Sequence, residues 1–525
     1  MKKRNIIIHL SVIAICSLCF ASCFELETKV YDKISPDIYP QNYQEADALV
    51  MSNVYNLFNS SWHIFNAAWG WQVLSFISTD EVETNWGNTS QYVGFENTPS
   101  AGWPVTDESR TPPYHQITFM SKMVLTLDRI KDVPMTEEQR DLLNAQIHCG
   151  MGFLGFLLYD LYGPVPLPSL EVLQRPLENE LVPRCTEEEM QNFIESNLLT
   201  AVEHLPYKWD DSEYGRFTKG LAKMLLLKYY MLMGGRTKNE GLLQLAAEYW
   251  NKAEKTGREL TNPEYGYLLV SDYHSLFTLA GEKNTEVIFS SPAINEKGMG
   301  HTWLAHALPS DYPVPGNFTR WGVFHLAWYF YDTYEKNDKR LEKIAAEYIG
   351  ETGVVHNRTA DKEGGLLHGA APVKYGLEGT IGTMCEIDLV VFRYADALTL
   401  LAEAIVRNNG GQVTDEALEY LNRIRERVGL SPYSLRDVGN ANNFLNLLLI
   451  ERGHELYMEG VRRQDLIRHG KFIQTGEEKL QRAGYLTSDR KNRIYQKTDG
   501  VHYDFERFPI PVSALNQGIA QNPGW

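Results

Sequence analysis

The stretch VFRYADALTLLAEAIVRNNGGQVTDEALEYLNRIRERV, residues 391–428, has the pattern of two paired helices. Its first half carries alanines and leucines at helical spacing, and its second half puts Ala417, Leu421 and Ile424 on one face. Small side chains let two helices approach closely, while a residue such as Tyr394 fills the groove between them. The length of the pair is near the tetratricopeptide unit of about 34 residues. This stretch therefore predicts a helical-repeat scaffold.

The N-terminal half contains further helix signals. Capping-box patterns begin helices at Thr136 and Thr186. The first helix is expected to end at Gly163-Pro164, because Gly permits a left-handed stop and Pro cannot continue the helix. Two more helices are expected over residues 218–233, ended by a pair of glycines, and over residues 242–260. The helix pair over residues 218–260 has a residue pattern similar to that of the pair over residues 391–428.

The middle of the chain differs. From residue 263 to residue 388 it is rich in Gly, Pro and aromatic residues, with one helix expected near 324–335. Helices are expected again over 389–408 and 443–460, and the chain from residue 472 onward is expected to be irregular. The fold class that these patterns predict is mainly α, a tetratricopeptide-like helical-repeat scaffold with an irregular, loop-rich binding subdomain.

The start of the chain has the three parts of a secretory signal. Residues 1–4 are basic, residues 6–20 are apolar, and Ala21-Ser22 precede a cysteine. The apolar run is shorter than the ~20 residues that span a bilayer, so a permanent helix anchor is not expected. The order Phe20-Ala21-Ser22-Cys23 resembles the lipobox of bacterial lipoproteins, in which the cysteine carries diacylglycerol and becomes the new N-terminus. We expect lipidation of Cys23; the alternative is an ordinary signal peptide with a chance cysteine.

Changes in residue composition along the chain predict its division into segments. The expected segments are a lipoprotein signal peptide at 1–22, the N-terminal part of the scaffold at 23–262 with a Trp-rich insert at about 60–115, a binding subdomain at 263–388, and the C-terminal scaffold with a closing tail at 389–525.

Composition narrows the class of protein. Hydrophobic residues make up 43% of the chain and charged residues 22%, as in ordinary globular proteins. The formal net charge of −17 repels phosphate backbones, so a nucleic-acid partner is not expected. Beyond the signal, Cys149, Cys185 and Cys385 are far apart and lack CxxC spacing. They are expected to be buried thiols, not zinc ligands.

No catalytic motif stands out. The chain has no GxSxG elbow, no GxxxxGK[ST] phosphate loop and no HExxH zinc helix. Glu451, Glu455 and Glu459 recur every fourth residue and could hold an acid–base pair, but a salt-bridge network with arginines of 452–468 is the favoured interpretation. The acidic residues of 80–83 could bind Ca²⁺ but lack the loop pattern of calcium sites, so no metal and no cofactor are expected.

Tryptophans gather in irregular sequence, where helix packing explains them poorly. Five of the eleven lie between residues 62 and 103. A flat indole can stack on the C–H face of a sugar ring while nearby polar side chains bond its hydroxyls. Any single tryptophan can instead belong to the core. The candidates for ligand binding are Asn85, Trp86, Trp303, Tyr312, Arg320 and Trp321.

A series of short motifs spans the chain in a specific order. They are Cys23 in its lipobox, YDLYGPVPL at 159–167, GRFTKGLA at 215–222, FRYADA at 392–397, Glu451-Arg452, EGVR at 459–462, DLIR at 465–468, FPIP at 508–511 and QNPGW at 521–525. Together they resemble the SusD/RagB family, the surface nutrient-binding lipoproteins of Bacteroidetes. Each motif is modest alone, but their order and spacing are specific.

The resemblance implies a tetratricopeptide-like scaffold that carries an irregular binding subdomain. It also implies a non-catalytic protein that is lipid-anchored in the outer membrane and faces the cell exterior. Such a protein sits as a lid over a TonB-dependent (SusC-like) β-barrel transporter and captures oligosaccharides with an aromatic arc. In this family the ligand-binding positions have no fixed motif, so the six candidates above rest on local composition alone.

The expected function is therefore capture of a glycan for import, with a glycan and a TonB-dependent transporter as partners and lipid as the membrane attachment. Three rival hypotheses remain open. The same fold could carry peptide or another non-sugar nutrient. A surface glycoside hydrolase would need two carboxylates ~5–10 Å apart in a cleft. A helical-repeat scaffold that binds only its transporter would have no soluble ligand.

Overall fold

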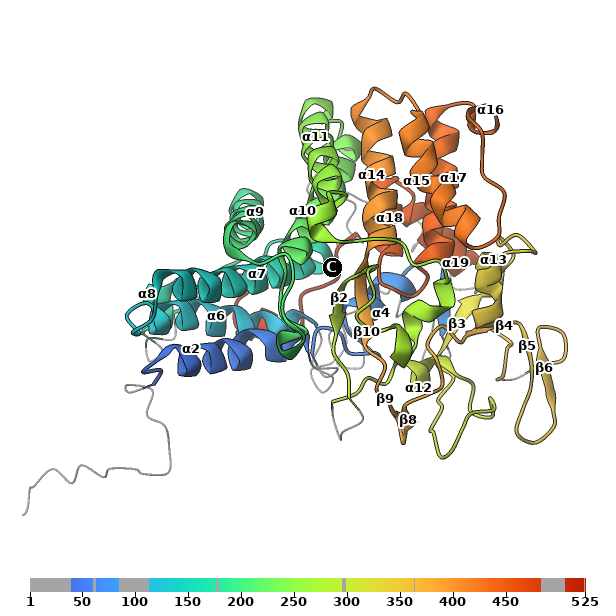
Figure 1. The fold of residues 1–525 in the computed structure, drawn as a ribbon, viewed down its shortest axis with the longest axis horizontal. Helices are drawn as coiled ribbons and strands as arrows, with labels where there is room; N and C mark the ends of the chain where they lie inside the picture. The colour runs from blue at the N-terminus through green and yellow to red at the C-terminus, as the bar shows by residue number, and fades with distance from the viewer. Residues whose placement is uncertain are drawn as a thin grey trace, which may run out of the picture.

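The computed structural model describes residues 39–59, 63–84, 113–175, 178, 180–294, 299–362, 364–482, 506–523 and 525. Helices make up most of these residues, and the short strands gather on one side of the molecule (Figure 1). The expected signal segment and Cys23 lie outside the described residues.

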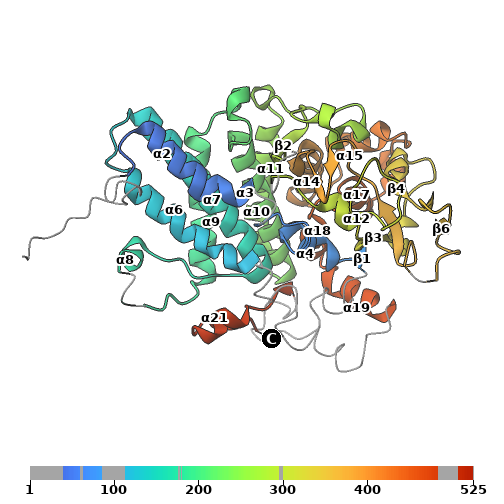
Figure 2. The ribbon, with the colours of Figure 1, turned by 90° about the horizontal axis from the view of Figure 1, so that it is seen from below.

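Paired helices form the N-terminal half. α7 (Glu137–Tyr162) packs on α9 (Glu187–His204), and α10 (Lys219–Asn239) packs on α11 (Leu243–Leu260). These helices lie side by side in Figures 1 and 2. Helices adjacent in sequence are thus adjacent in space, which is the repeat arrangement that the sequence predicts. The other elements of this half are α2 (Tyr43–Val50), a π-helical turn η2 (Met51–Tyr55), α3 (Asn56–Phe58), α4 (Trp71–Ile77), η4 (Pro113–Gln116), α6 (Ile117–Ile130), α8 (Leu170–Leu173) and η6 (Asp211–Glu213).

Both predicted capping boxes form. The Thr136 hydroxyl accepts the Gln139 N–H at 3.2 Å, and the Gln139 side chain accepts the Thr136 N–H at 3.0 Å. Thr186 begins α9 through the same pair of bonds. α7 ends at Gly163 with a φ of 73°, as its Gly-Pro pair predicts. Among the described helices, α7 alone is long and apolar enough to cross a membrane, but 83% of its apolar window is buried, so that apolar surface belongs to the core.

α10 is longer than the sequence predicts. The glycines at 234 and 235 were expected to stop it, but the helix continues to Asn239. Both glycines serve close packing instead. A Cβ on Gly234 would lie 2.6 Å from the Trp250 ring of α11, and a Cβ on Gly235 would lie 2.6 Å from the Cα of Arg468 in α18 (Arg462–Arg468).

We expect Gly235→Ala to lower the free energy of unfolding by about 1–3 kcal/mol, the usual cost of overpacking a core. The new methyl group would meet the backbone of α18, which cannot turn aside as a flexible side chain can. Urea unfolding followed by circular dichroism measures the change. Lys255→Ala, at an exposed position of α11, is the control and should stay within about 0.5 kcal/mol. A more stable Gly235→Ala protein would show that α18 is free to shift.

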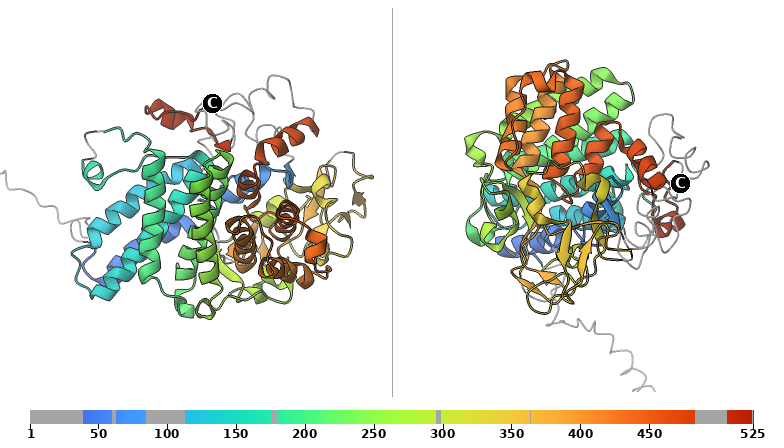
Figure 3. Two further views of the ribbon diagram at one scale, coloured as in Figure 1. Left: turned by 90° about the horizontal axis from the view of Figure 1, so that it is seen from above. Right: turned by 90° about the vertical axis from the view of Figure 1, so that its right-hand side faces the viewer.

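The stretch 391–428 is a strand followed by the predicted helix pair. α14 (Tyr394–Asn408) packs on α15 (Asp415–Arg427), on α17 (Ala441–Glu455) and on α11, so α14 joins the two halves of the scaffold (Figure 3). Residues 389–393 were expected to be helical but form β10 (Leu389–Arg393), because a short buried apolar run does not distinguish strand from helix. The remaining helices are α16 (Leu435–Val438), α19 (Phe472–Arg482) and α21 (Val512–Asn516). The prediction of irregular chain after residue 472 is therefore wrong over α19 and α21.

The middle of the chain contains small antiparallel sheets. The helix expected near 324–335 is instead β3 (Phe324–Ala327) followed by the short α13 (Trp328–Tyr331). β3 lies in a four-stranded sheet of order β1-β3-β7-β4, which brings β1 (Val82–Thr84) beside residues far away in sequence. The other elements are β2 (Val287–Ser291), which pairs with β10, β4 (Ile344–Ala345), β5 (Glu347–Ile349), β6 (Val355–Asn357), β7 (Gly369–Pro372), β8 (Thr380–Ile381), β9 (Met384–Cys385), α12 (Trp303–Ala307), η7 (Pro263–Tyr265), η8 (Tyr273–Phe277), η9 (Leu279–Gly281) and η10 (Lys339–Lys343).

A buried ion cluster crosses the interface between the scaffold and the middle region. It confirms that Glu451, Glu455 and Glu459 form a salt-bridge network, but its geometry differs from the prediction. α17 ends at Glu455 and Met458 has a φ of 58°, so Glu459 enters the cluster from a turn and not from the same helix face. The members of the cluster are Arg340, Lys374, Arg393, Arg425, Arg427, Glu286, Asp338, Glu451, Glu455 and Glu459.

The arginines between 452 and 468 have other partners. Arg452 bonds Asp396 and Asp465, while Arg468 bonds Glu403 and Asp465. The acidic residues of 80–83, considered above for calcium, are also engaged by the protein. Asp80 pairs with Arg462 at 2.8 Å, the Glu81 carboxylate accepts the Met458 N–H, and Glu83 accepts the Tyr329 hydroxyl at 3.0 Å.

The three cysteines are free thiols. Cys149 and Cys385 are buried, as predicted, whereas Cys185 is only partly buried. Burial raises the pKa of the Cys185 thiol to about 11, so even this thiol is protonated at neutral pH.

Candidate functional site

Trp321 is the only exposed tryptophan in the described part of the chain, with 40% of its surface accessible. Its backbone N–H donates to the Ala305 carbonyl of α12 at 2.6 Å. Its ring lies edge-on to His306, with 4.6 Å between the ring centroids. The indole is therefore held in a fixed orientation against α12 while part of its surface remains open to solvent.

Two segments linked to that of Trp321 through backbone bonds of the β8–β9 hairpin also carry exposed apolar side chains. The Thr319 N–H donates to the Gly382 carbonyl at 2.6 Å, which ties this segment to the β8–β9 hairpin. On the other side of the hairpin, His301 and Cys385 form a β-bridge. Ile381 at the hairpin tip is 58% exposed, and Met299 is 54% exposed. We call the surface of Met299, Trp321 and Ile381 the Trp321 face; α12, β8 and β9 lie together at the lower edge of Figure 1.

Arg320 and Tyr312, two of the predicted ligand-binding residues, make contacts within the protein. Both terminal nitrogens of Arg320 bond Glu351, at 2.6 and 3.1 Å, and Nη1 also donates to the Tyr312 carbonyl at 2.6 Å. The Tyr312 ring is half-buried and packs against Tyr348, with 5.0 Å between the centroids. Arg320 thus fixes the loop that carries Trp321, and both of its terminal nitrogens are engaged by the protein.

Trp303 lies in the core. It is 5% exposed, its ring packs against Tyr375 at 5.0 Å between centroids, and its backbone N–H donates to His301 Nδ1. It was predicted as a ligand-binding residue because the surrounding sequence is irregular, yet the side chain is turned inward from α12. In this structure Trp303 presents no free ring face, and its role is to hold α12 in place.

The other two predicted residues, Asn85 and Trp86, lie outside the described residues. Thr84, the residue before them, is paired with Phe324 in the β1–β3 ladder. Phe324 is three residues after Trp321, so the two parts of the predicted site, distant in sequence, are connected to adjacent positions of one sheet.

Neutral imidazoles lie beneath the face. Burial lowers the pKa of His301, His306 and His325 to about 4 each. Two carboxylates of this region are engaged: Glu351 pairs with Arg320, and Asp311 accepts the Tyr348 hydroxyl at 2.7 Å. No group of three potential metal ligands occurs in the ranges that the structure describes. This arrangement offers a rigid apolar platform for stacking and little for proton transfer.

Sequence comparisons identify proteins that are similar to this chain. Residues 285–525 match the sequence model of the SusD family. A SusD-like protein from Bacteroides ovatus is 24% identical over 450 residues, which cover 81% of this chain and 77% of that protein. The matched part of the chain, residues 285–525, belongs to the SusD/RagB family.

Solved structures of SusD-like proteins share the fold of this chain. A laminarin-binding SusD-like protein superposes with a TM-score of 0.70 at 23% identity, covering 92% of this chain and 100% of the other. Surface glycan-binding protein A from Bacteroides thetaiotaomicron, in complex with laminarihexaose, gives a TM-score of 0.68 at 18% identity, covering 92% and 99%. These likenesses confirm the predicted SusD-like, mainly α scaffold.

Two of the SusD motifs serve the architecture of this chain. Arg216 of GRFTKGLA pairs with Asp47 at 2.7 Å, and Arg393 of FRYADA lies in the buried ion cluster. Sequence reasoning missed the exposed side chains of Met299 and of Ile381, which lies in the β8–β9 hairpin. The GTIGT run at 379–383 was the available signal, because closely spaced glycines favour a tight turn.

Proposed function

We propose that this SusD-family protein is a non-catalytic, cell-surface glycan-binding lipoprotein that captures oligosaccharide or polysaccharide for import. The observation that carries the proposal is the exposed Trp321 indole, whose ring packs edge-on against His306 and whose backbone N–H bonds α12. Folding buries most large aromatics, so a fixed and open indole is suited to stacking on a sugar ring. Family relatives that bind laminarin and laminarihexaose support the same class of ligand.

Segment 263–388 supplies Trp321 and most of its supports, so we propose it as the binding subdomain on the helical scaffold. Asn85 and Trp86 complete the proposed site from the Trp-rich insert. The SusD-like relatives whose names describe glycan binding support binding without catalysis.

Attachment and transport are further parts of this proposal. Lipid on Cys23 would anchor the chain in the outer membrane, with the protein facing the exterior. The partner would be a TonB-dependent (SusC-like) transporter, for which the protein acts as a lid. Family membership and the lipobox support both statements.

Trp321→Ala is the test of the proposed site. Protein beginning at Phe24 would be run through native gels containing neutral plant, host and microbial polysaccharides. We expect one or more polysaccharides to retard the wild-type protein, with affinity about tenfold weaker in Trp321→Ala, since a stacked aromatic anchor contributes at least about 1.4 kcal/mol. Leu243→Ala, at a 68% exposed position of α11, is the control and should bind as wild type.

The outcomes separate the alternatives. Retardation that is unchanged in Trp321→Ala would keep glycan binding and remove the Trp321 face as its site. A Trp86→Ala variant then tests the other half of the predicted site. Lack of retardation by every polysaccharide would reject the glycan proposal in favour of a peptide cargo or a role confined to the transporter.

A further inference from the structure

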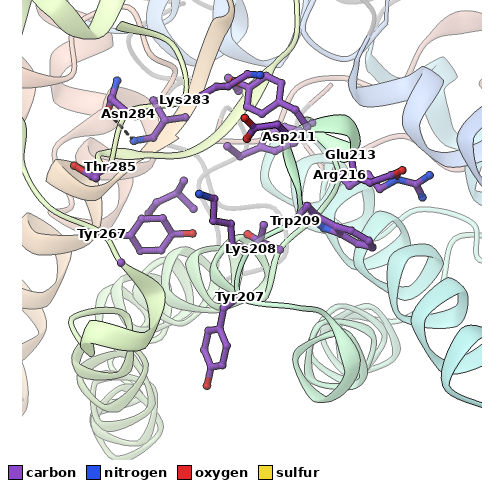
Figure 4. Close-up of a pocket in the computed structure, with 18 of the residues that line it drawn as sticks. Tyr207, Lys208, Trp209, Asp211, Glu213, Arg216, Tyr267, Lys283, Asn284 and Thr285 are labelled. Carbon is purple, nitrogen blue, oxygen red and sulfur yellow. Dashed lines mark hydrogen bonds and ion pairs between the residues drawn. The ribbon is translucent and has the colours of Figure 1, made fainter.

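A cavity lies on the scaffold, between the α9–α10 connection, the turn after α11 and the segment that leads into β2 (Figure 4). Its volume is about 360 Å³. Small-molecule sites generally have volumes of roughly 300–1,000 Å³, so this cavity can hold a small ligand. No residue of the Trp321 face or of the β8–β9 hairpin lines it. The cavity is therefore separate from the site proposed above.

Aromatic rings form much of its wall. Tyr265 and Tyr267 are nearly parallel, with 6.2 Å between their centroids and 21° between their planes. Trp209 is fixed on the opposite side, because its indole N–H donates to the Phe217 carbonyl at 2.7 Å. Figure 4 shows Tyr267 beside the cavity, whereas the side chains of Tyr207 and Arg216 point away from it.

Three charged side chains of the wall, Lys208, Asp210 and Asp211, form no side-chain hydrogen bond or ion pair with a described residue. Figure 4 shows Lys208 and Asp211 directed toward the same space in front of Tyr267. Both are exposed. Several other polar groups of the wall are engaged. Arg216 pairs with Asp47, Tyr214 donates to Asp388, and Lys283 lies 4.5 Å from the centre of the Tyr214 ring.

The backbone at the rim is also unusual. Lys283 has a φ of 58°, a left-handed conformation that costs energy for a residue with a side chain. The neighbouring Asn284 side chain accepts the N–H groups of Glu286 and Val287, at 2.7 and 3.3 Å, and so holds this conformation. The rim therefore has a defined shape before any ligand binds.

The free groups specify the chemistry of a ligand. A lysine ammonium only donates hydrogen bonds and a carboxylate only accepts them, whereas a hydroxyl group does both. Lys208 would attract an anion, but Asp211 would repel it. Asp211 would attract a cation, but Lys208 would repel it. A ligand that carries many hydroxyls and no net charge satisfies both groups, and its C–H faces can lie against the tyrosine rings.

We propose that this cavity is a second saccharide site, which binds a single unit of an uncharged sugar on the scaffold. The proposal extends the glycan-binding function proposed above and rests on it for the class of ligand. A second site would hold a polysaccharide chain at two points, which raises avidity without any change at the Trp321 face.

The test observes Lys208 directly. Reductive methylation with ¹³C-formaldehyde labels the lysines of the protein that begins at Phe24, and Lys208→Arg identifies the Lys208 signal in NMR spectra. Glucose, galactose, mannose and xylose are added one at a time. We expect at least one of them to shift the Lys208 signal saturably, while the signal of the exposed Lys336 stays in place. Asp211→Ala should weaken that binding about tenfold, as loss of a hydrogen bond to a charged group does. Asp132→Ala, at another exposed aspartate, should not weaken it.

Several results would overturn the proposal. These are a Lys208 signal that none of the four sugars moves, or one that glucuronic acid or phenylalanine moves as strongly as the best sugar. A shift that is lost in Trp321→Ala would show that the cavity is not an independent site. A shift that persists in a protein that no polysaccharide retards would keep the saccharide cavity and reject the proposed polysaccharide capture, so the two failures are distinguishable.

Discussion

Replacing Glu455 with Gln is expected to lower the free energy of unfolding by about 3–5 kcal/mol, the cost of leaving a buried charge without its partner. Gln has nearly the same shape as Glu, so the change removes a charge and little else. Glu455 is fully buried at the centre of the ion cluster, where its carboxylate pairs with Arg393 at 2.5 Å, with Arg340 at 3.2 Å and with Arg427.

The sign of this effect follows from the state of the carboxyl group. Burial alone would raise the pKa of Glu455, but the three arginines outweigh burial and hold the pKa well below its ordinary value. A carboxylate with a depressed folded-state pKa stabilises the protein above its unfolded-state pKa, and that stability is lost as the pH falls through the folded-state value. At neutral pH the full contribution of Glu455 is present, so the substitution removes all of it.

Urea unfolding at neutral pH measures the loss. Glu419→Gln, at an exposed position of α15, is the matched control and should change the unfolding free energy by less than about 0.5 kcal/mol. A Glu455→Gln protein as stable as wild type would mean that the arginines find other partners or water. In that case the cluster would not be a main support of the interface between the scaffold and the middle region.

Local patterns predicted those parts of the fold that depend on neighbouring residues. The capping boxes at Thr136 and Thr186 and the stop at Gly163 involve residues close in sequence, and each formed as predicted. The glycines at 234 and 235 look identical to a helix stop in sequence. Only the approach of Trp250 and Arg468 shows that they are packing positions.

The candidate site was less predictable for the same reason. The irregular sequence around Trp303 and Trp321 is similar, but one ring is buried and the other is exposed. The difference comes from Tyr375 and the β8–β9 hairpin, which lie more than fifty residues away in sequence. Lys208 and Asp211 carry no motif, and only the fold leaves them without partners beside a cavity.

Acid is expected to reverse the relative stability of wild type and a His301→Gln variant. The ring of His301 accepts the Trp303 N–H at Nδ1 and bonds the Ile387 carbonyl at 2.7 Å through Nε2, so both contacts require the neutral form with its proton on Nε2. Burial lowers the pKa of His301 from 6.5 to about 4. Below pH 6.5 His301 binds a proton in the unfolded chain but stays neutral in the folded protein. The free energy of unfolding therefore decreases as the pH falls toward 4.

The expected size of this effect is about 3 kcal/mol between about pH 7 and pH 4.5, at about 1.4 kcal/mol for each pH unit below 6.5. Wild-type stability alone does not isolate it, because burial raises the pKa of Glu81 to about 8 and that group acts with the opposite sign. The measurement is therefore the difference in unfolding free energy between the two proteins at each pH. At pH 7 the His301→Gln variant should be less stable than wild type, because it lacks the ring contacts. Between pH 7 and pH 4.5 its unfolding free energy relative to wild type should rise by about 3 kcal/mol.

His204→Gln, at an exposed position of α9, is the control and should show a nearly constant difference from wild type. A constant difference for His301→Gln as well would mean that the folded protein accepts the proton. The ring would then have to turn away from the Trp303 N–H, and α12 would be free to move. Since α12 supports the Trp321 ring, glycan binding measured over the same pH range should then weaken together with stability, whereas a ring that stays neutral leaves the platform intact until the protein unfolds.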